Sequence, residues 1–236
     1  ALPICHGVGL SQIGARGKAL GGESAASILS YYYSGTQLLS LNDNQNIRVN
    51  IGHLLTSAKM ATATPDATLQ IFSGDIGDAQ DQIPLATVPV KSSLNFSILG
   101  STVVPSIATG KKIVSIPRNR VFTVRWTGTR YLAGVDGVIS LTHNSTTKKY
   151  RYGQMQFRAV KASTLGYRLE ITNSVRLSDE YLWGVSEVPS SWPEAALQAQ
   201  AIASRTYAMN KAGIYRASCD CDLYGEISDQ SFLGYA

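Results

Sequence analysis

One acidic residue, Glu187, lies in a proline-bracketed turn directly before a long alanine-rich stretch. Pro189 disfavours helical geometry at Val188 and keeps the backbone extended there. A carboxyl group on a rigid turn close to an aromatic residue, here Trp192, is suited to donate or accept a proton. Local structure needs no acid at this position. We therefore interpret Glu187 as a candidate general acid or base, and an exposed turn carboxylate without function is the alternative.

A second dense motif lies at the opposite end of the chain, where residues 6–15 read His-Gly-Val-Gly-Leu-Ser-Gln-Ile-Gly-Ala. Its three glycines allow backbone amides to approach a ligand or a neighbouring segment closely. Ser11 invites comparison with the nucleophile of serine hydrolases, but the G-x-S-x-G pattern fails because two residues separate Ser11 from Gly14. A histidine in the core or at a hinge is the simpler interpretation of His6.

The elements that must position these motifs are predicted from hydrophobic periodicity. Residues 11–34 are predicted to be helical, and Ser24 could cap part of that segment. After Glu187, the residues from Ser191 to Glu194 have the S-x-x-E form of a capping box at the start of a long helix. Glu194 then has a structural role as a cap, which leaves Glu187 as the acid that still requires an explanation.

Between about residues 46 and 177 the pattern changes to short β-type runs separated by glycines and other turn residues. Such runs without intervening helices predict an antiparallel sheet, sandwich or barrel. The predicted class is α+β, with small helical elements at both ends forming the catalytic core around a large, mainly antiparallel β region. The predicted strands are Ile47–Ile51, Thr68–Phe72, Asn95–Leu99, Lys112–Ile116, Val121–Trp126, Val138–Thr142, Tyr152–Val160 and Tyr167–Ile171.

Three segments follow from this pattern. Residues 1–45 form the N-terminal helical part of the core, residues 46–160 form the β-rich region, which could be an inserted domain, and residues 161–236 complete the core. A dense motif begins at residue 6 and the chain stops without a closing element, so we expect a fragment that is truncated at its C-terminus. No internal repeat or low-complexity linker separates the segments.

Charge and hydropathy indicate which kinds of molecule the protein could bind and whether it could cross a membrane. The chain has 21 Lys and Arg against 16 Asp and Glu among 236 residues, and this excess favours an anionic polymer. The basic residues are scattered, and the densest group, residues 148–151, is better interpreted as a solvated loop than as a nucleic-acid site. No apolar run approaches the ~20 residues of a membrane span. We expect a secreted protein whose signal peptide has been removed.

The three cysteines are Cys5, Cys219 and Cys221. A disulfide between Cys219 and Cys221 would close a very tight, strained ring, whereas a bridge from Cys5 to either of them is sterically open if the two end motifs meet in an oxidising compartment. Free thiols are an equally open alternative. Cys219 and Cys221 could bind zinc together with a histidine, but the usual metal motifs are absent, so no cofactor is expected.

Together the two end motifs resemble the SpoIID/LytB family of bacterial cell-wall proteins. Residues 186–208 are similar to the family's core signature almost throughout, and residues 6–15 are similar to its second signature, which residues 28–29 and 32–36 continue. The second signature comes first here, as in secreted actinobacterial-type members. Cys5 replaces the glycine that often precedes the family's histidine, and the family's downstream Ser-Gly-Gly segment is missing.

The resemblance implies a lytic transglycosylase that cleaves peptidoglycan glycan strands, with Glu187 as the catalytic acid/base. Glu187 would protonate the glycosidic oxygen and then deprotonate the muramyl 6-hydroxyl as it attacks the anomeric carbon. The substrate supplies its own nucleophile, so the carboxylate pair of ordinary glycosidases is not required. The resemblance further implies five glycan-binding or Glu187-positioning residues, namely His6, Ser11, Gln12, Gln200 and Arg205.

Three alternatives remain open at this stage. A second carboxylate from Asp220, Asp222 or Glu226 would make the protein a glycan hydrolase. A non-catalytic wall-binding module that enhances a separate amidase is consistent with the LytB name and with the net positive charge. A structural surface protein that retains only the fold would account for the large β region without a recognisable signature.

Overall fold

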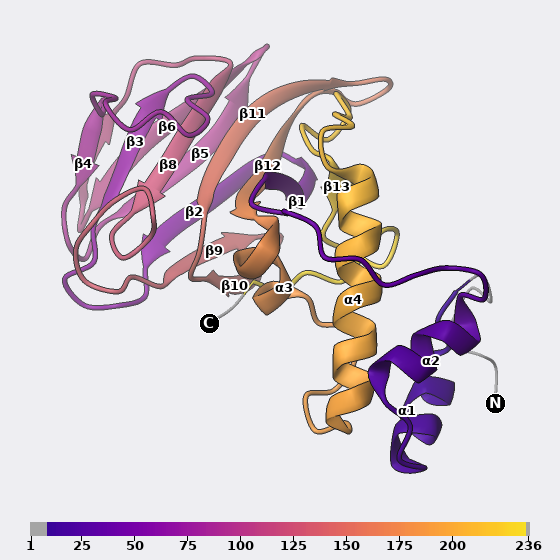
Figure 1. Ribbon diagram of the computed structural model, residues 1–236. Coiled ribbons are helices and arrows are strands. Elements are labelled where there is room, and N and C mark those ends of the chain that lie inside the picture. Colours follow the sequence, from indigo (N-terminus) through magenta and orange to yellow (C-terminus); the bar gives the residue numbers. More distant parts are fainter. Residues whose placement is uncertain (1–8, 235–236) are drawn as a thin grey trace.

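The computed structural model describes residues 9–234 and shows a layered β structure beside a group of helices (Figure 1). One sheet has seven strands in the order β13-β1-β12-β11-β8-β3-β4, and the other has six in the order β10-β9-β2-β5-β6-β7. In the described residues, neighbouring strands are antiparallel except for β1 and β13. The predicted α+β class is therefore confirmed.

The strand bounds show that all eight predicted runs form strands, and that five further strands lie among them. The seven-stranded sheet contains β1 (Asn46–Leu55), β3 (Leu69–Ser73), β4 (Ala86–Val88), β8 (Val121–Trp126), β11 (Gln154–Ala162), β12 (Gly166–Arg176) and β13 (Leu223–Tyr224). The six-stranded sheet contains β2 (Ser57–Thr62), β5 (Ser93–Leu99), β6 (Thr102–Thr109), β7 (Lys112–Ser115), β9 (Ile139–His143) and β10 (Thr146–Tyr150).

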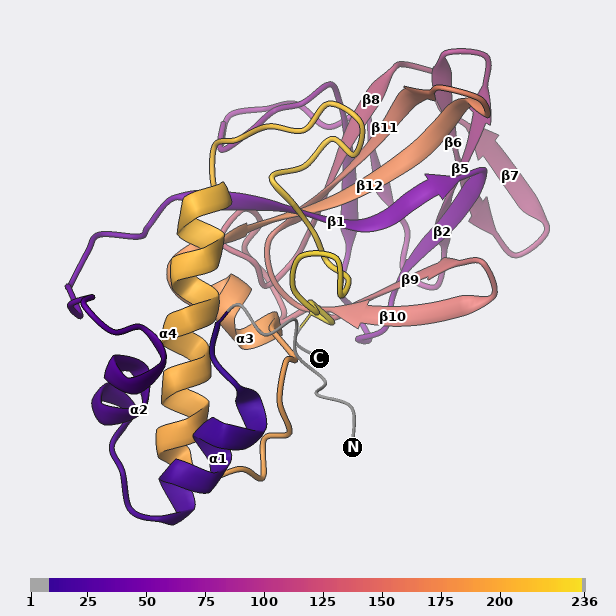
Figure 2. The ribbon, with the colours of Figure 1, turned by 90° about the vertical axis from the view of Figure 1, so that its right-hand side faces the viewer.

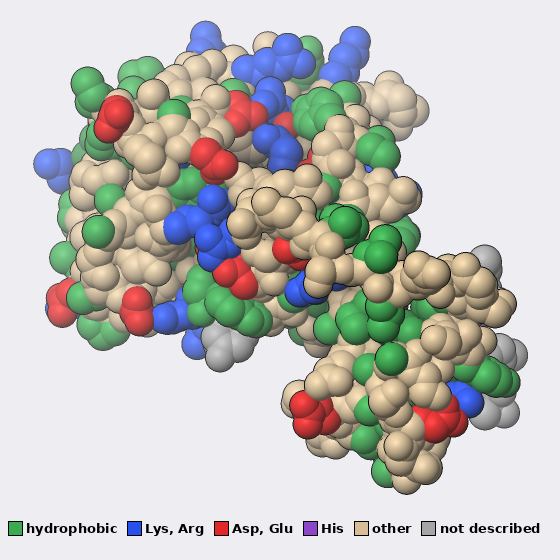
Figure 3. All heavy atoms as spheres, in the orientation of Figure 1, with side chains coloured by type: hydrophobic (Ala, Val, Ile, Leu, Met, Phe, Trp, Pro, Cys, Tyr) green, Lys and Arg blue, Asp and Glu red, His purple; other side chains and the backbone are tan. Residues whose placement is uncertain are grey.

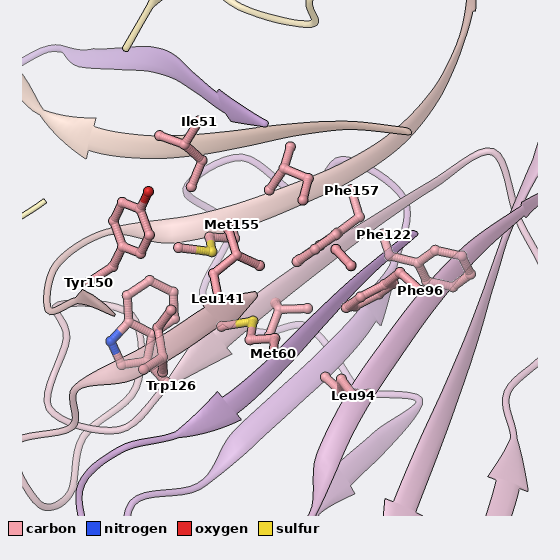
Figure 4. Close-up of a cluster of buried hydrophobic side chains, with 14 of the residues drawn as sticks. Ile51, Met60, Leu94, Phe96, Phe122, Trp126, Leu141, Tyr150, Met155 and Phe157 are labelled. Carbon is pink, nitrogen blue, oxygen red and sulfur yellow. The ribbon is translucent and has the colours of Figure 1, made fainter. Parts of the chain in front are cut away.

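The two sheets pack face to face around one hydrophobic core (Figure 4). Met60 and Leu94 from the six-stranded sheet are fully buried with Met155 from the seven-stranded sheet. Phe96 of β5 stacks on Phe157 of β11, with ring centroids 3.7 Å apart and planes 10° from parallel. Side chains from both inner faces thus interdigitate as in a β-sandwich.

The same core continues into the C-terminal third of the chain. β11 crosses the predicted boundary between residues 160 and 161, and it pairs with both β8 and β12. Ala208 and Phe232 belong to the same buried cluster as the strands of the β region. The β-rich region and the following segment therefore share a sheet and a core, while the domain limits themselves stay a prediction.

The helices gather along one side of the sandwich, where α4 (Glu194–Lys211) is the longest (Figure 2). The helices α1 (Gln12–Leu20) and α2 (Ala25–Tyr32) pack against α4 through a small separate cluster that includes Ala199. Small alanine side chains let these backbones approach closely. A π-helical turn, η1 (Leu177–Tyr181), and the short α3 (Leu182–Gly184) lead from β12 toward the Glu187 turn.

The N-terminal helix differs from its prediction because it is interrupted. Residues 11–34 form two helices, and the chain turns between them at Gly21 and Gly22, where Gly22 has a φ of 87°. A positive φ of this kind is readily adopted only by glycine. The predicted cap at Ser24 is confirmed, because its side chain accepts a hydrogen bond from the Ser27 N–H at 3.2 Å.

The start of α4 corrects the predicted capping box. The residue that precedes the helix is Pro193, and it makes no side-chain capping hydrogen bond. Glu194 is instead the first helical residue, and its carboxylate accepts a 2.9 Å hydrogen bond from Gln198 one turn later. A proline fixes the backbone at the helix entrance without side-chain help, and an acid in the first turn is favoured by the helix dipole.

The cysteine pairing is also a correction. Cys219 and Cys221 form a disulfide with each other, with Cα atoms 5.2 Å apart, so neither pairs with Cys5. The tight ring is possible because Asp220 between them adopts a left-handed conformation with φ of 53°. The side chain of Asp220 accepts hydrogen bonds from Arg48 at 2.7 Å and from the Tyr215 hydroxyl at 2.9 Å, which hold this conformation. Cys5 lies outside the described residues.

Peptide mapping under non-reducing conditions tests this pairing. We expect one proteolytic peptide that contains both Cys219 and Cys221 and is lighter by two hydrogens than its reduced form. The peptide that contains Cys5 should react with iodoacetamide before any reduction. A cross-linked peptide that joins Cys5 to either partner would contradict the structure.

Among the described helices, none combines the length and the apolar character that crossing a membrane requires. On the face in Figure 3, Lys and Arg side chains lie beside Asp and Glu rather than in a field of one sign. Among the described residues, Arg151 pairs with Asp136 at 2.9 Å, and Arg48 pairs with Asp75 at 3.1 Å. Opposite charges are therefore interspersed on the face shown in Figure 3.

Candidate functional site

The turn that carries Glu187 is held by a second segment of the chain near its C-terminal end. Ser186 donates its backbone N–H to the Ser231 carbonyl at 2.8 Å, and Val185 and Phe232 form an isolated antiparallel bridge. The Leu233 N–H donates to the Gly184 carbonyl at 2.9 Å. The backbone that leads into the candidate acid is thus fixed by paired hydrogen bonds rather than by the turn alone.

Each carboxylate oxygen of Glu187 accepts a hydrogen bond from a different part of the chain. The Ser231 backbone N–H donates to Oε1 at 2.6 Å, and the Gln12 side-chain amide donates to Oε2 at 3.4 Å. Glu187 itself is half-buried. Gln12 of the N-terminal motif thus contacts Glu187 although the two residues are 175 positions apart in the sequence. His6 lies outside the described residues.

Ser11 positions Gln12 indirectly. The Ser11 hydroxyl caps α1 by accepting the Gly14 N–H at 3.2 Å, so Gln12 becomes the first residue of the helix. The Leu10 N–H just before it donates to the Tyr33 hydroxyl at 3.1 Å. These contacts fix the entrance to α1, and with it the direction in which the Gln12 side chain projects toward Glu187.

Replacing the α1 cap should affect both stability and the acid. We expect Ser11→Ala to lower the free energy of unfolding by about 1 kcal/mol, as losing an N-cap usually does. The matched variant Ser24→Ala removes the equivalent cap from α2, which has no hydrogen bond to Glu187 among those of the described residues. Thermal unfolding should therefore change similarly in both variants, whereas the glycan cleavage that the sequence resemblance implies should slow only in Ser11→Ala. Equal rates in the two variants would contradict this role.

The other two predicted positioning residues face different partners on α4. Gln200 donates to the Ser204 hydroxyl at 3.1 Å, and Arg205 lies 3.0 Å from the carboxylate of Asp43 in an ion pair. Arg205 therefore fastens the connection between α2 and β1 to the helix. In the described residues neither side chain forms a hydrogen bond with Glu187, and their role in binding glycan stays a prediction.

Asp229 is a site residue that the sequence analysis did not select. Its carboxylate accepts two hydrogen bonds from Arg216, at 2.7 and 3.2 Å, and one from the Tyr224 backbone N–H at 2.9 Å. The Tyr207 hydroxyl donates a further bond to it. Burial would raise the pKa of Asp229, but these donors outweigh burial and hold the pKa below its ordinary value. Asp229 is thus an ionised anchor two residues before the donor to Glu187.

The loop that contains this anchor is seated on the core by its next residues. Gln230 accepts a hydrogen bond from the buried Tyr181 hydroxyl, and Phe232 stacks on the Tyr181 ring with centroids 5.6 Å apart. A side chain at Gly184 would collide with the Phe232 ring, because an added Cβ would lie 2.3 Å from it. The spacing of Asp229 and Ser231 gave no local signal of this role, since Asp229 is held mainly by the side chains of Arg216 and Tyr207 and Ser231 donates to Glu187, 44 positions away.

The three acids considered as a second carboxylate have other surroundings. Asp220 is fully buried between Arg48 and Arg158, whose guanidinium groups lie 2.7 and 2.8 Å from it. Asp222 accepts the Arg48 backbone N–H at 3.0 Å, and burial raises its pKa. Glu226 is exposed to solvent. Within residues 9–234 none of these three shares a hydrogen bond with Glu187.

A zinc site is not favoured by the donor atoms of the described residues. The sulfurs of Cys219 and Cys221 are bonded to each other, whereas zinc is ligated by free thiolates. No group of three or more His, Cys, Asp or Glu side chains in the described part of the chain is arranged to hold a metal ion.

Comparison with known families identifies the segment that builds this site. Residues 166–236 match the family model SpoIID, described as Stage II sporulation protein. Over these residues the chain is similar to the SpoIID family. The match begins at β12 and includes Glu187, α4 and the loop of Asp229 and Ser231, and it supports membership of the SpoIID family. It also supports a protein related to sporulation or the cell wall. Neither a curated protein nor a solved structure matches the chain significantly.

The matched residues cover one of the two motifs that predicted the family. The N-terminal helices α1 and α2 lie outside the match, yet Gln12 of α1 contacts the acid inside it. The SpoIID family is associated with cell-wall lytic activity, which gives the chemistry of this site a peptidoglycan-related context.

Proposed function

We propose that this protein is a secreted lytic transglycosylase that cleaves the linkage between N-acetylmuramic acid and N-acetylglucosamine in peptidoglycan strands. The observation that carries the proposal is the environment of Glu187, whose two carboxylate oxygens accept hydrogen bonds from Gln12 of the N-terminal motif and from the Ser231 N–H near the C-terminal end. The family match at residues 166–236 supplies the cell-wall context.

The geometry suits a single carboxyl group that acts first as acid and then as base. Glu187 in its protonated form donates to the glycosidic oxygen as the bond to the anomeric carbon breaks. The resulting carboxylate then takes the proton from the muramyl 6-hydroxyl, whose oxygen attacks the anomeric carbon. The products are a free 4-hydroxyl on one fragment and a 1,6-anhydromuramyl end on the other, and no water is consumed.

The surrounding donors support both halves of this cycle. The Ser231 N–H is fixed in the backbone, so it offers a hydrogen bond to the carboxylate without reorganisation. The hydrogen bond from Gln12 is longer than the bond from Ser231, at 3.4 Å against 2.6 Å. Gln12 also belongs to α1, which packs on α4 through a small hydrophobic cluster separate from the main core. Gln12 is therefore the donor that can adjust as the proton is exchanged.

Product analysis tests the reaction class. Glycan strands stripped of stem peptides are incubated with the protein, and the fragments are separated and weighed by mass spectrometry. We expect 1,6-anhydromuramyl ends, which are 18 mass units (one water) lighter than hydrolytic ends and resist borohydride reduction. Reducible ends instead would identify a hydrolase, and intact strands would contradict an enzymatic role.

The second candidate function is a non-catalytic wall-binding module that enhances an amidase, as the net charge of +5 favours contact with an anionic wall. This module would sediment with purified wall and stimulate a partner amidase equally well with or without the Glu187 carboxyl. Stimulation that depends on Glu187 would count against it.

A further inference from the structure

An aromatic pair joins α3, which leads to the turn of the proposed acid, to Tyr152 in the connection between β10 and β11. Trp183 of α3 is 52% exposed, and its ring centroid is 5.0 Å from that of Tyr152 with the planes tilted by 49°. The other two tryptophans differ, because Trp126 is fully buried and Trp192 is half-buried with the Arg16 guanidinium 5.8 Å from its ring centroid. A large aromatic side chain left half in water near a reactive group is a candidate contact for a ligand.

Tyr152 is held in place from several directions. Its carbonyl accepts a hydrogen bond from Asn173 at 3.2 Å, and the carbonyl of the preceding Arg151 accepts one from the buried Trp126 indole at 3.0 Å. The Arg151 side chain donates to the Tyr152 hydroxyl at 3.2 Å. The following Gly153 has a φ of 81° and packs directly against β12. The pair therefore needs little ordering when it meets a ligand.

The pair is close to Glu187 along a rigid stretch of backbone. Trp183 and Glu187 are four positions apart in the sequence, and a fully extended chain of that length spans at most about 14 Å. The residues between them are pinned by the hydrogen bonds of Gly184 and Ser186 to the C-terminal segment. A glycan strand whose scissile linkage lies at Glu187 can therefore place a neighbouring sugar ring over Trp183.

The chemistry of this surface matches a sugar ring better than a purely apolar partner. Pyranose rings present a face of C–H groups, which packs on the electron-rich face of an aromatic ring, and an edge of hydroxyl and amide groups. Beside Tyr152, the pair formed by Arg151 and Asp136 supplies charged hydrogen-bonding groups at 2.9 Å from each other. An aromatic face with a charged rim offers partners for both parts of the sugar.

We propose that Trp183 and Tyr152 form an additional sugar-binding subsite that stacks a pyranose ring of the glycan strand next to the linkage at Glu187. This inference rests on the proposed function for the identity of the polymer. It assigns Trp183 to binding, so its replacement should raise KM and leave kcat nearly unchanged.

Fluorescence quenching tests the contact directly. The protein carries Glu187→Gln to prevent turnover and Trp192→Phe to leave Trp183 as the only exposed tryptophan, because Trp126 is fully buried. Acrylamide quenching is measured with and without peptide-free glycan oligosaccharides, and calorimetry reports whether they bind. We expect bound glycan to protect Trp183 from acrylamide severalfold. Unchanged quenching with bound glycan overturns the subsite, and so does the absence of any binding.

Affinity measurements with a matched control complete the test. Trp183→Ala should weaken glycan binding roughly tenfold, the upper range expected for an aromatic contact, and Trp183→Phe should restore most of it. Tyr31→Ala removes another exposed aromatic ring, 66% exposed on α2, and should change nothing. Equal affinity in the Trp183 and Tyr31 variants overturns the proposal. Protection of Trp183 in a protein that forms no anhydromuramyl ends would retain the subsite and reject the enzyme.

Discussion

Replacing the Glu187 carboxyl by an amide should lower the rate of anhydromuramyl-end formation by about 10²–10⁴-fold, the range that a general acid or base contributes. The Glu187→Gln side chain keeps its size, and its amide oxygen can still accept the Ser231 N–H. What it loses is the proton that the glycosidic oxygen requires. The rate is measured by chromatography of the released fragments under saturating glycan.

The matched control for this variant lies on the next helix. Glu194→Gln removes a negative charge seven residues later, from an exposed acid whose partner is Gln198. Its rate should stay within about twofold of the native rate, and both variants should unfold at similar temperatures, since surface substitutions rarely change stability much. If Glu187→Gln cleaves glycan as fast as Glu194→Gln does, the assignment of Glu187 as acid/base is wrong.

The sequence predicted the acid but only part of its surroundings. Glu187 could be identified because the proline-bracketed turn and the following helix are local signals, and Gln12 because it lies in a dense motif. Asp229 and Ser231 could not, because their function depends on Arg216 and on a backbone pairing that only the folded chain creates. Contacts between distant residues leave no periodic pattern in the sequence.

The same distinction explains the strands that were missed. Strands such as β8 and β12 contain long β-branched or aromatic runs, which single-sequence patterns indicate well. β6 contains Pro105, which lacks a backbone donor, and β10 is rich in lysine and threonine. These strands form because their neighbours β5 and β9 offer pairing partners. Tertiary pairing overrides weak local preference in both cases.

The disulfide was mispredicted for a related reason. The tight ring of Cys219 and Cys221 is unfavourable when only chain geometry is considered. The fold compensates by burying Asp220 in a left-handed conformation among Arg48, Arg158 and Tyr215.

The second large loss of glycan-cleaving rate is expected when Asp229, which we interpret as a positioning residue, is replaced. Asp229→Ala removes the acceptor of Arg216 and of the Tyr224 N–H, so the loop that presents the Ser231 N–H to Glu187 loses its anchor. A displacement of about 1 Å at a reacting group can cost roughly 10²-fold in rate. We expect kcat to fall by about that factor while KM changes little, measured over a range of glycan concentrations.

A purely structural role for Asp229 would instead lower the unfolding temperature without changing kcat per folded molecule. Asp75→Ala controls for the loss of ion pairs, because Asp75 pairs with Arg48 and Arg158 rather than with the loop. Arg216→Ala should reduce kcat as Asp229→Ala does, and the double variant should be no slower than either, since both remove the same contact. Additive effects of the two substitutions would show that Asp229 does not act on Glu187 through its pairing with Arg216.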